Sequence, residues 1–293
     1  PPSPATVPAE ARAVLTIDLD ALRSNWRTVR SRLTHAECAA VIKADAYGLG
    51  LEQIAGALVA EGCRTVFVAT LDEARRVRIV SPALTIYVLD GLLPGAAASY
   101  IGFNLRPCLS SLDEIAEWSA AGAERGERLK AALHIDTGMN RLGLTAHDVE
   151  TLARAWDTFD GFQCTLVMSH LACADVPGHP MNDAQRTRFD ELRAKLPPLP
   201  ASLANSGGTF LDPAFQYDLV RPGIVLFGGR ALEGRPNPMR HVVTLKARIL
   251  QIRDCAPGAT VGYGAAYTCD RPTRLATIAC GYADGFLRAI SRA

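Results

Sequence analysis

The chain has 293 residues, of which 48% are hydrophobic and 21% are charged, values typical of a folded globular protein rather than a disordered or fibrous one. Its 31 basic and 30 acidic side chains leave a net charge of +1, so no overall field favours nucleic acid or a membrane surface, and a small molecule is the expected partner. No apolar run reaches the length of a membrane span, and residues 1–10 lack the basic start and apolar core of a signal peptide, which predicts a cytoplasmic protein.

The eight cysteines are widely spaced and form no Cys-x-x-Cys pair, which argues against a zinc site. Most of them lie in apolar stretches, as expected for free thiols that pack as small hydrophobic side chains in a reducing compartment. We therefore predict neither a bound metal nor a disulfide framework.

Short apolar runs alternate with longer amphipathic segments up to about residue 229, the pattern of βα units with a parallel sheet. A first helix begins at Asp18, and the first strand candidate ends at Lys43. Seven further strand candidates follow, at residues 65–69, 83–89, 104–108, 130–136, 164–169, 201–204 and 218–221. Apolar residues have helical spacing in segments between them, such as 71–79, 112–121 and 183–195.

Eight such units in about two hundred residues predict a TIM (β/α)8 barrel. An open doubly wound sheet is the alternative fold, but no Gly-x-Gly-x-x-Gly turn follows the first strand. An α/β barrel would place a binding site at the carboxyl ends of its strands.

The sequence pattern changes beyond Gly229. Residues 230–239 are rich in Pro, Gly and Arg, as in a linker, and strands without helices are expected at 242–252, 259–262 and 275–280. Three strands make a marginal sheet, so this second domain either needs a partner or is incomplete. We predict three parts: an N-terminal leader over residues 1–13, the barrel over 14–229, and the start of a C-terminal, mostly-β domain over 230–293.

The first strand leads into the stretch AAVIKADAYGLG at residues 39–50, where a buried strand ends in Lys43 and a glycine-containing turn opens a helix. A lysine at a strand end can simply extend its ammonium into solvent. Burial would instead disfavour the charged form, and a neutral amine is what a lysine needs to form a Schiff base with a carbonyl compound.

Two more loops follow the last two predicted strands, which is where a TIM barrel binds phosphate. They are ANSGG at residues 204–208 and RPGI at residues 221–224. Their glycines let backbone N–H groups approach an anion closely. Each loop alone could be an ordinary turn, but both loops together with the strand-end lysine favour pyridoxal 5′-phosphate (PLP) as cofactor.

These three segments resemble those of the alanine racemases, barrel-type PLP enzymes, and so do residues 134–143, 169–172 and 261–268. The resemblance runs from about Val14 to the C-terminal end. It implies a PLP-dependent amino-acid racemase that interconverts L-alanine and D-alanine, with D-alanine supplied for peptidoglycan. A broad-specificity amino-acid racemase, a barrel-type PLP decarboxylase and a non-catalytic PLP-binding protein are the alternatives.

The resemblance also implies roles for individual residues. Lys43 would carry the cofactor and act as one catalytic base, and Tyr263 would be the second base. Cofactor contacts are implied for Tyr47, His170, Asn205, Ser206, Arg221, Gly223 and Ile224. Substrate contacts are implied for Arg141, Tyr282 and Arg288. An arginine facing the cofactor's pyridine nitrogen, as Arg221 would, donates a hydrogen bond and accepts no proton, so the nitrogen would stay unprotonated.

Because Tyr263 and Lys43 lie in different predicted domains, we expect a head-to-tail homodimer with shared active sites. Two features depart from the family pattern. A further piece of the β domain, with a Cys-Met-Asp segment and another tyrosine, does not appear in the sequence, and the family's often carbamylated fifth-strand lysine is His134. We hypothesise that a neutral His134, or a bound anion such as chloride, holds Arg141 in its place.

Overall fold

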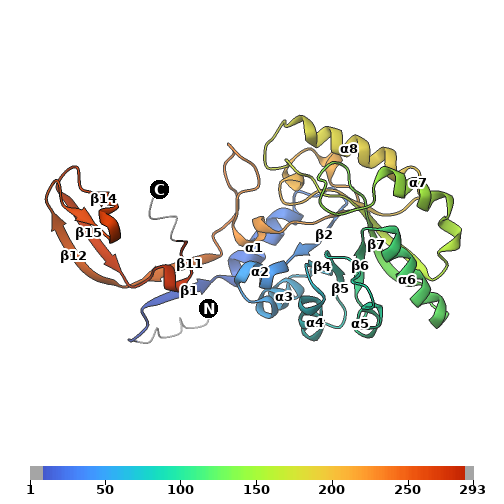
Figure 1. Cartoon of the computed structure of the whole chain (residues 1–293), viewed down its shortest axis with the longest axis horizontal. Helices are drawn as coiled ribbons and strands as arrows, with labels where there is room; N and C mark the ends of the chain where they lie inside the picture. The colour runs from blue at the N-terminus through green and yellow to red at the C-terminus, as the bar shows by residue number, and fades with distance from the viewer. Residues whose placement is uncertain (1–8, 288–293) are drawn as a thin grey trace. The chain divides into compact units, whose positions relative to one another are not determined.

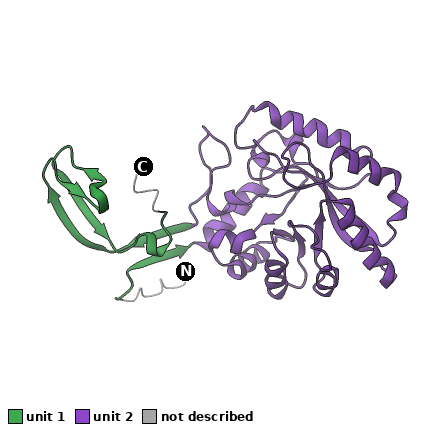
Figure 2. Ribbon diagram, viewed as in Figure 1, with its two compact units in different colours: residues 1–17, 243–293 green, residues 18–242 purple. Residues whose placement is uncertain are grey.

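The computed structural model describes residues 9–287, and the predicted barrel lies in the larger of its two units, Asp18–Val242 (Figure 2). We call this the barrel unit. The other, here the β unit, joins described residues 9–17 to residues 243–287. No helix within residues 9–287 has the length and apolar character needed to cross a membrane.

Parallel strands form the sheet of the barrel unit in chain order. They are β3 (Ala40–Val41), β4 (Thr65–Val68), β5 (Thr85–Val88), β6 (Arg106–Leu109), β7 (Leu129–His134), β8 (Phe162–Met168) and β9 (Ala201–Ser202). The remaining strand, β10 (Leu219–Val220), pairs in parallel with β2 (Glu37–Cys38), which directly precedes β3. On its other side, the N–H groups of Asp218 and Arg221 donate to the carbonyls of Ala201 and Ala204 at 3.0 and 2.9 Å. β10 therefore lies between β9, at one edge of the seven-stranded sheet, and β2, which leads into β3 at the other edge. This closes the barrel, and the predicted TIM-type fold is confirmed.

Helices follow the strands and lie around the sheet (Figure 1). They are α1 (Leu19–Arg30), α3 (Leu51–Ala60), α4 (Leu71–Val80), α5 (Ala97–Gly102), α6 (Leu112–Arg125), α7 (Ala146–Arg154) and α8 (Pro180–Arg193). Hydroxyl side chains fix several helix starts: Thr70 caps α4 and Ser111 caps α6, each by accepting a hydrogen bond from the N–H of a glutamate three residues later.

Side chains from successive strands fill the barrel interior. The rings of Phe67 and Tyr87 stack with centroids 4.9 Å apart, and smaller residues such as Cys108 and Ala132 pack beside them in one buried cluster. All eight cysteines are free thiols. Because the interior is packed, the polar side chains at the carboxyl ends of the strands lie at one end of a filled apolar core rather than along an open channel.

The β unit contains three antiparallel pairs. β1 (Ala13–Ile17) pairs with β11 (Val243–Ala247), β12 (Ile249–Cys255) with β15 (Thr273–Ile278), and β13 (Thr260–Val261) with β14 (Tyr267–Thr268). The segment predicted as one strand at 242–252 is thus two strands, interrupted at Arg248. Strand β1 takes residues 13–17 into this unit, and the domain boundaries at residues 13 and 229 stay predictions.

Candidate active site

A cavity of about 470 Å³ lies at the carboxyl ends of the barrel strands, within the size range of small-molecule sites. Predicted site residues from the segments that follow β3, β7, β8, β9 and β10 line this cavity. They are Lys43, Tyr47, Arg141, His170, Asn205, Ser206, Arg221, Gly223 and Ile224. Tyr263 and Tyr282 belong to the β unit instead, where their side chains are 90% and 73% exposed. Arg288 lies outside the described residues.

Lys43 follows β3 and begins a turn of unusual handedness, α2 (Lys43–Gly48). Four consecutive residues, from Ala44 to Tyr47, have φ values of 54°, 53°, 55° and 59°. Each non-glycine residue in a left-handed helical conformation costs roughly 1–2 kcal/mol, so the surroundings must hold this turn. The regular helix that the sequence predicts after Lys43 begins only at Leu51.

Tyr47, at the far end of this turn, meets the two glycine loops. The N–H of Gly223 donates to the Ser206 hydroxyl at 2.9 Å. A Cβ on residue 223 would clash with the Tyr47 hydroxyl oxygen and lie 3.3 Å from the Val41 Cβ. Burial raises the pKa of Tyr47, which keeps its hydroxyl protonated and able to donate. Two hydroxyls and a glycine backbone therefore converge on one small volume, an arrangement suited to an anion.

Arg221 is only 3% exposed, and its partners within residues 9–287 are neutral oxygens. The guanidinium donates to the Ser202 hydroxyl and to the carbonyls of Ser169 and Leu203. Burial lowers its pKa to about 10, so it stays charged at neutral pH. A guanidinium has five N–H donors, so Arg221 can still donate to an acceptor in the cavity.

His134 and His170 line the same cavity, and both are neutral at pH 7. Desolvation is the main cause that lowers their pKa values to about 4 and about 3, followed by the positive charges of Arg221 and Arg141. Our hypothesis that His134 holds Arg141 assumes the neutral imidazole. No hydrogen bond joins His134 to Arg141 within residues 9–287. That His134 or a bound anion orients the Arg141 side chain therefore stays a prediction.

Replacing His134 with glutamine should change how stability depends on pH. The imidazole has a pKa of about 6.5 when unfolded and about 4 when folded, so between these values the unfolded chain binds a proton that the folded protein does not. Stability is therefore lost as the pH falls. We expect the free energy of unfolding to fall more steeply in wild type than in His134→Gln, by up to about 1.4 kcal/mol per pH unit between about pH 6 and pH 4.5. Urea unfolding at each pH measures both slopes, and parallel slopes would contradict the assignment.

Arg141 lies on the loop after β7, which one carboxylate organises. Asp136 Oδ1 accepts hydrogen bonds from the N–H groups of Gly138, Met139 and Asn140 at 3.0, 3.0 and 3.1 Å. The N–H of Leu144 then donates to the His134 carbonyl at 2.8 Å and closes the loop. The Arg141 side chain is exposed at the rim of the cavity.

Sequence reasoning missed three residues that support the site: Asp136, Glu73 and Arg76. The Asp-x-Gly-x-Asn pattern at 136–140 is a turn signal that could have identified Asp136. Thr70 and Glu73 have the spacing of a capping box, but this signal alone does not predict that Glu73 also reaches the Lys43 turn. We find no sequence signal for Arg76.

Comparisons with known proteins agree with this arrangement. Residues 17–231 match the family profile "Alanine racemase, N-terminal domain", and residues 242–293 match "Alanine racemase, C-terminal domain". An alanine racemase of Methylobacterium nodulans is 54% identical over 278 residues, which are 94% of this chain and 75% of that protein. A catabolic alanine racemase of Mesorhizobium japonicum is 48% identical over 281 residues, 96% of this chain and 74% of that protein. The crystal structure of an alanine racemase from Bartonella henselae with covalently bound pyridoxal phosphate is similar with a TM-score of 0.90 and 38% identity, over 95% of this chain and 78% of that one.

Proposed function

The chain belongs to the alanine racemase family and is a PLP-dependent alanine racemase, and we propose that Lys43 carries its cofactor and Tyr263 completes its active site. The observation that carries the Lys43 assignment is the convergence of Lys43, the Tyr47–Ser206–Gly223 cradle and Arg221 on one cavity.

The cavity residues fit PLP on three counts. The cradle is open only because residue 223 is glycine, and its two hydroxyls can donate to a phosphate while the Gly223 N–H positions the Ser206 oxygen. Within residues 9–287, Arg221 is buried and has neutral partners only, so it can donate to an acceptor such as a pyridine nitrogen. Lys43 lines the same cavity, as a lysine must to hold the cofactor's carbonyl group.

When bound, PLP supplies an electron sink that stabilises the charge left at the substrate's Cα after proton loss. Arg221 donates but accepts no proton, so an acceptor facing it stays unprotonated and the sink is weaker than one paired with a carboxylate, which favours simple proton exchange over other bond cleavages. Arg141, at the cavity rim, carries the positive charge needed to bind a substrate carboxylate.

Inversion at Cα requires one base on each face of the substrate. Lys43 Nζ would move the proton on one face, and the Tyr263 hydroxyl would move it on the other. Tyr263 follows Gly262 and precedes Gly264, both with positive φ, and its ring is 90% exposed in this chain. A phenol that acts in a dry cavity must be covered, and a second copy of the chain can supply the cover. We therefore infer a head-to-tail homodimer in which Tyr263 of the partner subunit serves the cavity of Lys43.

The direct test of the activity is incubation of the holoenzyme with L-alanine. A racemase forms D-alanine until the two enantiomers are equal, whereas a decarboxylase releases carbon dioxide and ethylamine and a carrier changes nothing. A panel of other L-amino acids measures substrate breadth. A cytoplasmic location and a role in supplying D-alanine for peptidoglycan are part of the proposal; the latter predicts that a strain without the enzyme needs added D-alanine.

Gly223→Ala should weaken PLP binding. The added Cβ clashes with the Tyr47 hydroxyl, so the cradle must open or lose its shape. We expect the PLP dissociation constant of the variant apoenzyme to rise by about tenfold or more, which corresponds to about 1.4 kcal/mol. Gly102→Ala is the matched control, because no heavy atom lies within 4 Å of its added Cβ. Equal PLP affinity in the two variants, measured by absorbance titration, would contradict the cradle.

A further inference from the structure

The left-handed turn sets where two cavity side chains lie. Lys43 precedes the four residues with positive φ and Tyr47 is the last of them, and both side chains line the cavity. If this turn relaxed to a right-handed helix, the directions of both side chains would change, because Cβ directions follow the backbone. Whatever holds the turn therefore also places the amine relative to the anion cradle.

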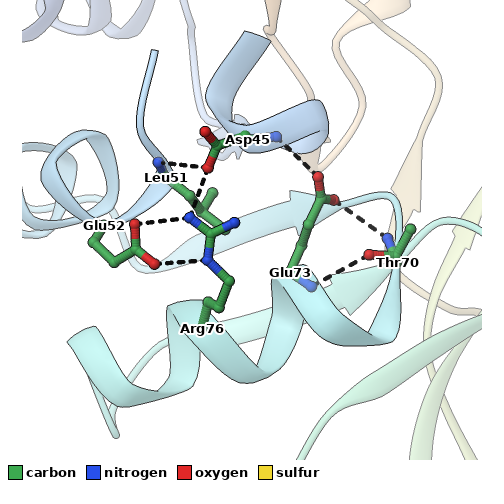
Figure 3. A network of polar contacts seen from close by, with 6 residues as sticks. All are labelled: Asp45, Leu51, Glu52, Thr70, Glu73 and Arg76. Carbon is green, nitrogen blue, oxygen red and sulfur yellow. Dashed lines mark hydrogen bonds and ion pairs between the residues drawn. The ribbon is translucent and has the colours of Figure 1, made fainter. Parts of the chain in front are cut away.

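A buried carboxylate from the neighbouring βα unit holds the centre of the turn (Figure 3). Glu73 Oε1 accepts a hydrogen bond from the Asp45 N–H at 3.0 Å. Its other oxygen accepts from the N–H groups of Ala69 and Thr70, at 2.9 and 3.3 Å, where β4 ends. Glu73 is 8% exposed. One carboxylate thus joins the Lys43 turn to the adjacent strand end.

Arg76, one helical turn further along α4, makes the second link (Figure 3). Its guanidinium contacts Asp45 Oδ1 at 2.7 Å and both carboxylate oxygens of Glu52 in α3, at 2.7 and 2.9 Å. Asp45 Oδ1 also accepts from the Leu51 N–H, the first residue of α3, at 3.2 Å. Asp45 is therefore held through its backbone N–H by Glu73 and through its side chain by Arg76.

We propose that Glu73 and Arg76 are positioning residues of the racemase, which hold the strained turn so that Lys43 and Tyr47 face the cavity together. This inference rests on the proposed role of Lys43. Neither residue lines the cavity, so each acts through the backbone that it holds. Glu73 also holds Ala69, which lines the cavity, so hydrogen exchange at the turn is the readout that isolates the turn. The buried Glu73 link should matter more than the half-exposed Arg76 link, because water screens and competes with the latter.

The barrel contains a matched control for Glu73. Glu114 has the same position in α6, three residues after its cap Ser111, and its carboxylate also reaches back to the strand end and across to a neighbouring loop. It accepts from the N–H groups of Ser110 and Leu92 at 3.0 and 3.2 Å. The Leu92 loop holds no predicted cofactor residue, so Glu114→Gln makes the same substitution without touching the Lys43 turn. Both N–H groups bind one oxygen, Oε2, so the glutamine oxygen can still accept from both.

The test compares Glu73→Gln with Glu114→Gln. A glutamine keeps the shape but replaces one acceptor oxygen with a donor, so at residue 73 it cannot bind all three N–H groups. We expect Glu73→Gln to lose more thermal stability than Glu114→Gln, because the Glu114 contacts need only one acceptor oxygen. Only Glu73→Gln should speed amide hydrogen exchange at residues 42–51 of the apoenzyme, by about tenfold, the factor for one lost hydrogen bond. It alone should also weaken PLP binding and lower kcat, by about 10- to 100-fold, the size expected when a catalytic group is misplaced.

Arg76→Met and Arg76→Lys provide a second pair, because their exposed site tolerates substitution. Arg76→Met should speed exchange at the turn and weaken PLP binding, but both effects should be smaller than in Glu73→Gln. Arg76→Lys keeps the positive charge, so its PLP affinity should lie between those of Arg76→Met and the wild type. The positioning role is wrong if Glu73→Gln and Glu114→Gln match in PLP affinity and kcat, or if exchange at residues 42–51 is unchanged. Wild-type enzyme with PLP on another lysine would instead refute the proposed function, while the exchange comparison would still show whether α4 holds the turn.

Discussion

Lys43→Ala should be colourless after incubation with PLP and should lose more than about 10⁴-fold in kcat, because the substitution removes the amine that we propose holds the cofactor and acts as one of the two bases. Lys43 lines the cavity at the start of the left-handed turn, and no other lysine within residues 9–287 lines it. Racemisation of L-alanine and the visible absorbance of the dialysed protein measure the two effects separately.

The control for this substitution is Lys130→Ala. Lys130 lies on β7 of the same barrel, but its side chain is exposed and does not line the cavity. That variant should keep its colour and its kcat within about twofold, as for other exposed side chains. A yellow Lys43→Ala protein with substantial activity would show that another residue carries the cofactor.

Tyr263→Phe should reduce kcat by about 10²- to 10⁴-fold, the range for loss of a general acid–base group, with a smaller effect on PLP binding. Tyr267→Phe is the matched control, because Tyr267 lies four residues further along in the same unit and is also exposed. Proton exchange into alanine from deuterated water refines the test. With one base left, a single enantiomer should still exchange its Cα proton while conversion to the other stops.

Mixing the two inactive variants tests whether the sites are shared. In a heterodimer of Lys43→Ala and Tyr263→Phe subunits, one site has both lesions and the other has none, provided that each site takes its tyrosine from the partner. Random exchange of equal amounts should then recover about a quarter of the wild-type activity, since half of the dimers have one intact site. Verified heterodimers without activity would show that each chain builds its own site.

The sequence predicted the barrel because its strands are short buried runs that alternate with helical periodicity, a local signal. The loops at residues 204–208 and 221–224 were found in the same way, by their glycines and by their order in the barrel. The structure brings both loops to one cavity with Lys43 and Tyr47. Each of these inferences depended only on local sequence patterns and on their order along the chain.

The remaining features depend on contacts between distant segments. Four consecutive non-glycine residues with positive φ contradict local preference, and the Lys43 turn is stabilised by Glu73 and Arg76, about thirty residues away in the next βα unit. Strand β1 likewise joins the β unit by pairing with β11, at the other end of the chain. The sequence alone does not specify such pairings, because many partners satisfy the same hydrophobic pattern.

Chemical mapping of the cofactor lysine tests the central claim most directly. The holoenzyme is reduced with borohydride, which fixes the cofactor to the amine that holds it, and the digested protein is analysed by mass spectrometry. We predict that the pyridoxyl group is found on the peptide that contains Lys43 and on no other. Its recovery on a different lysine would contradict the account of this active site.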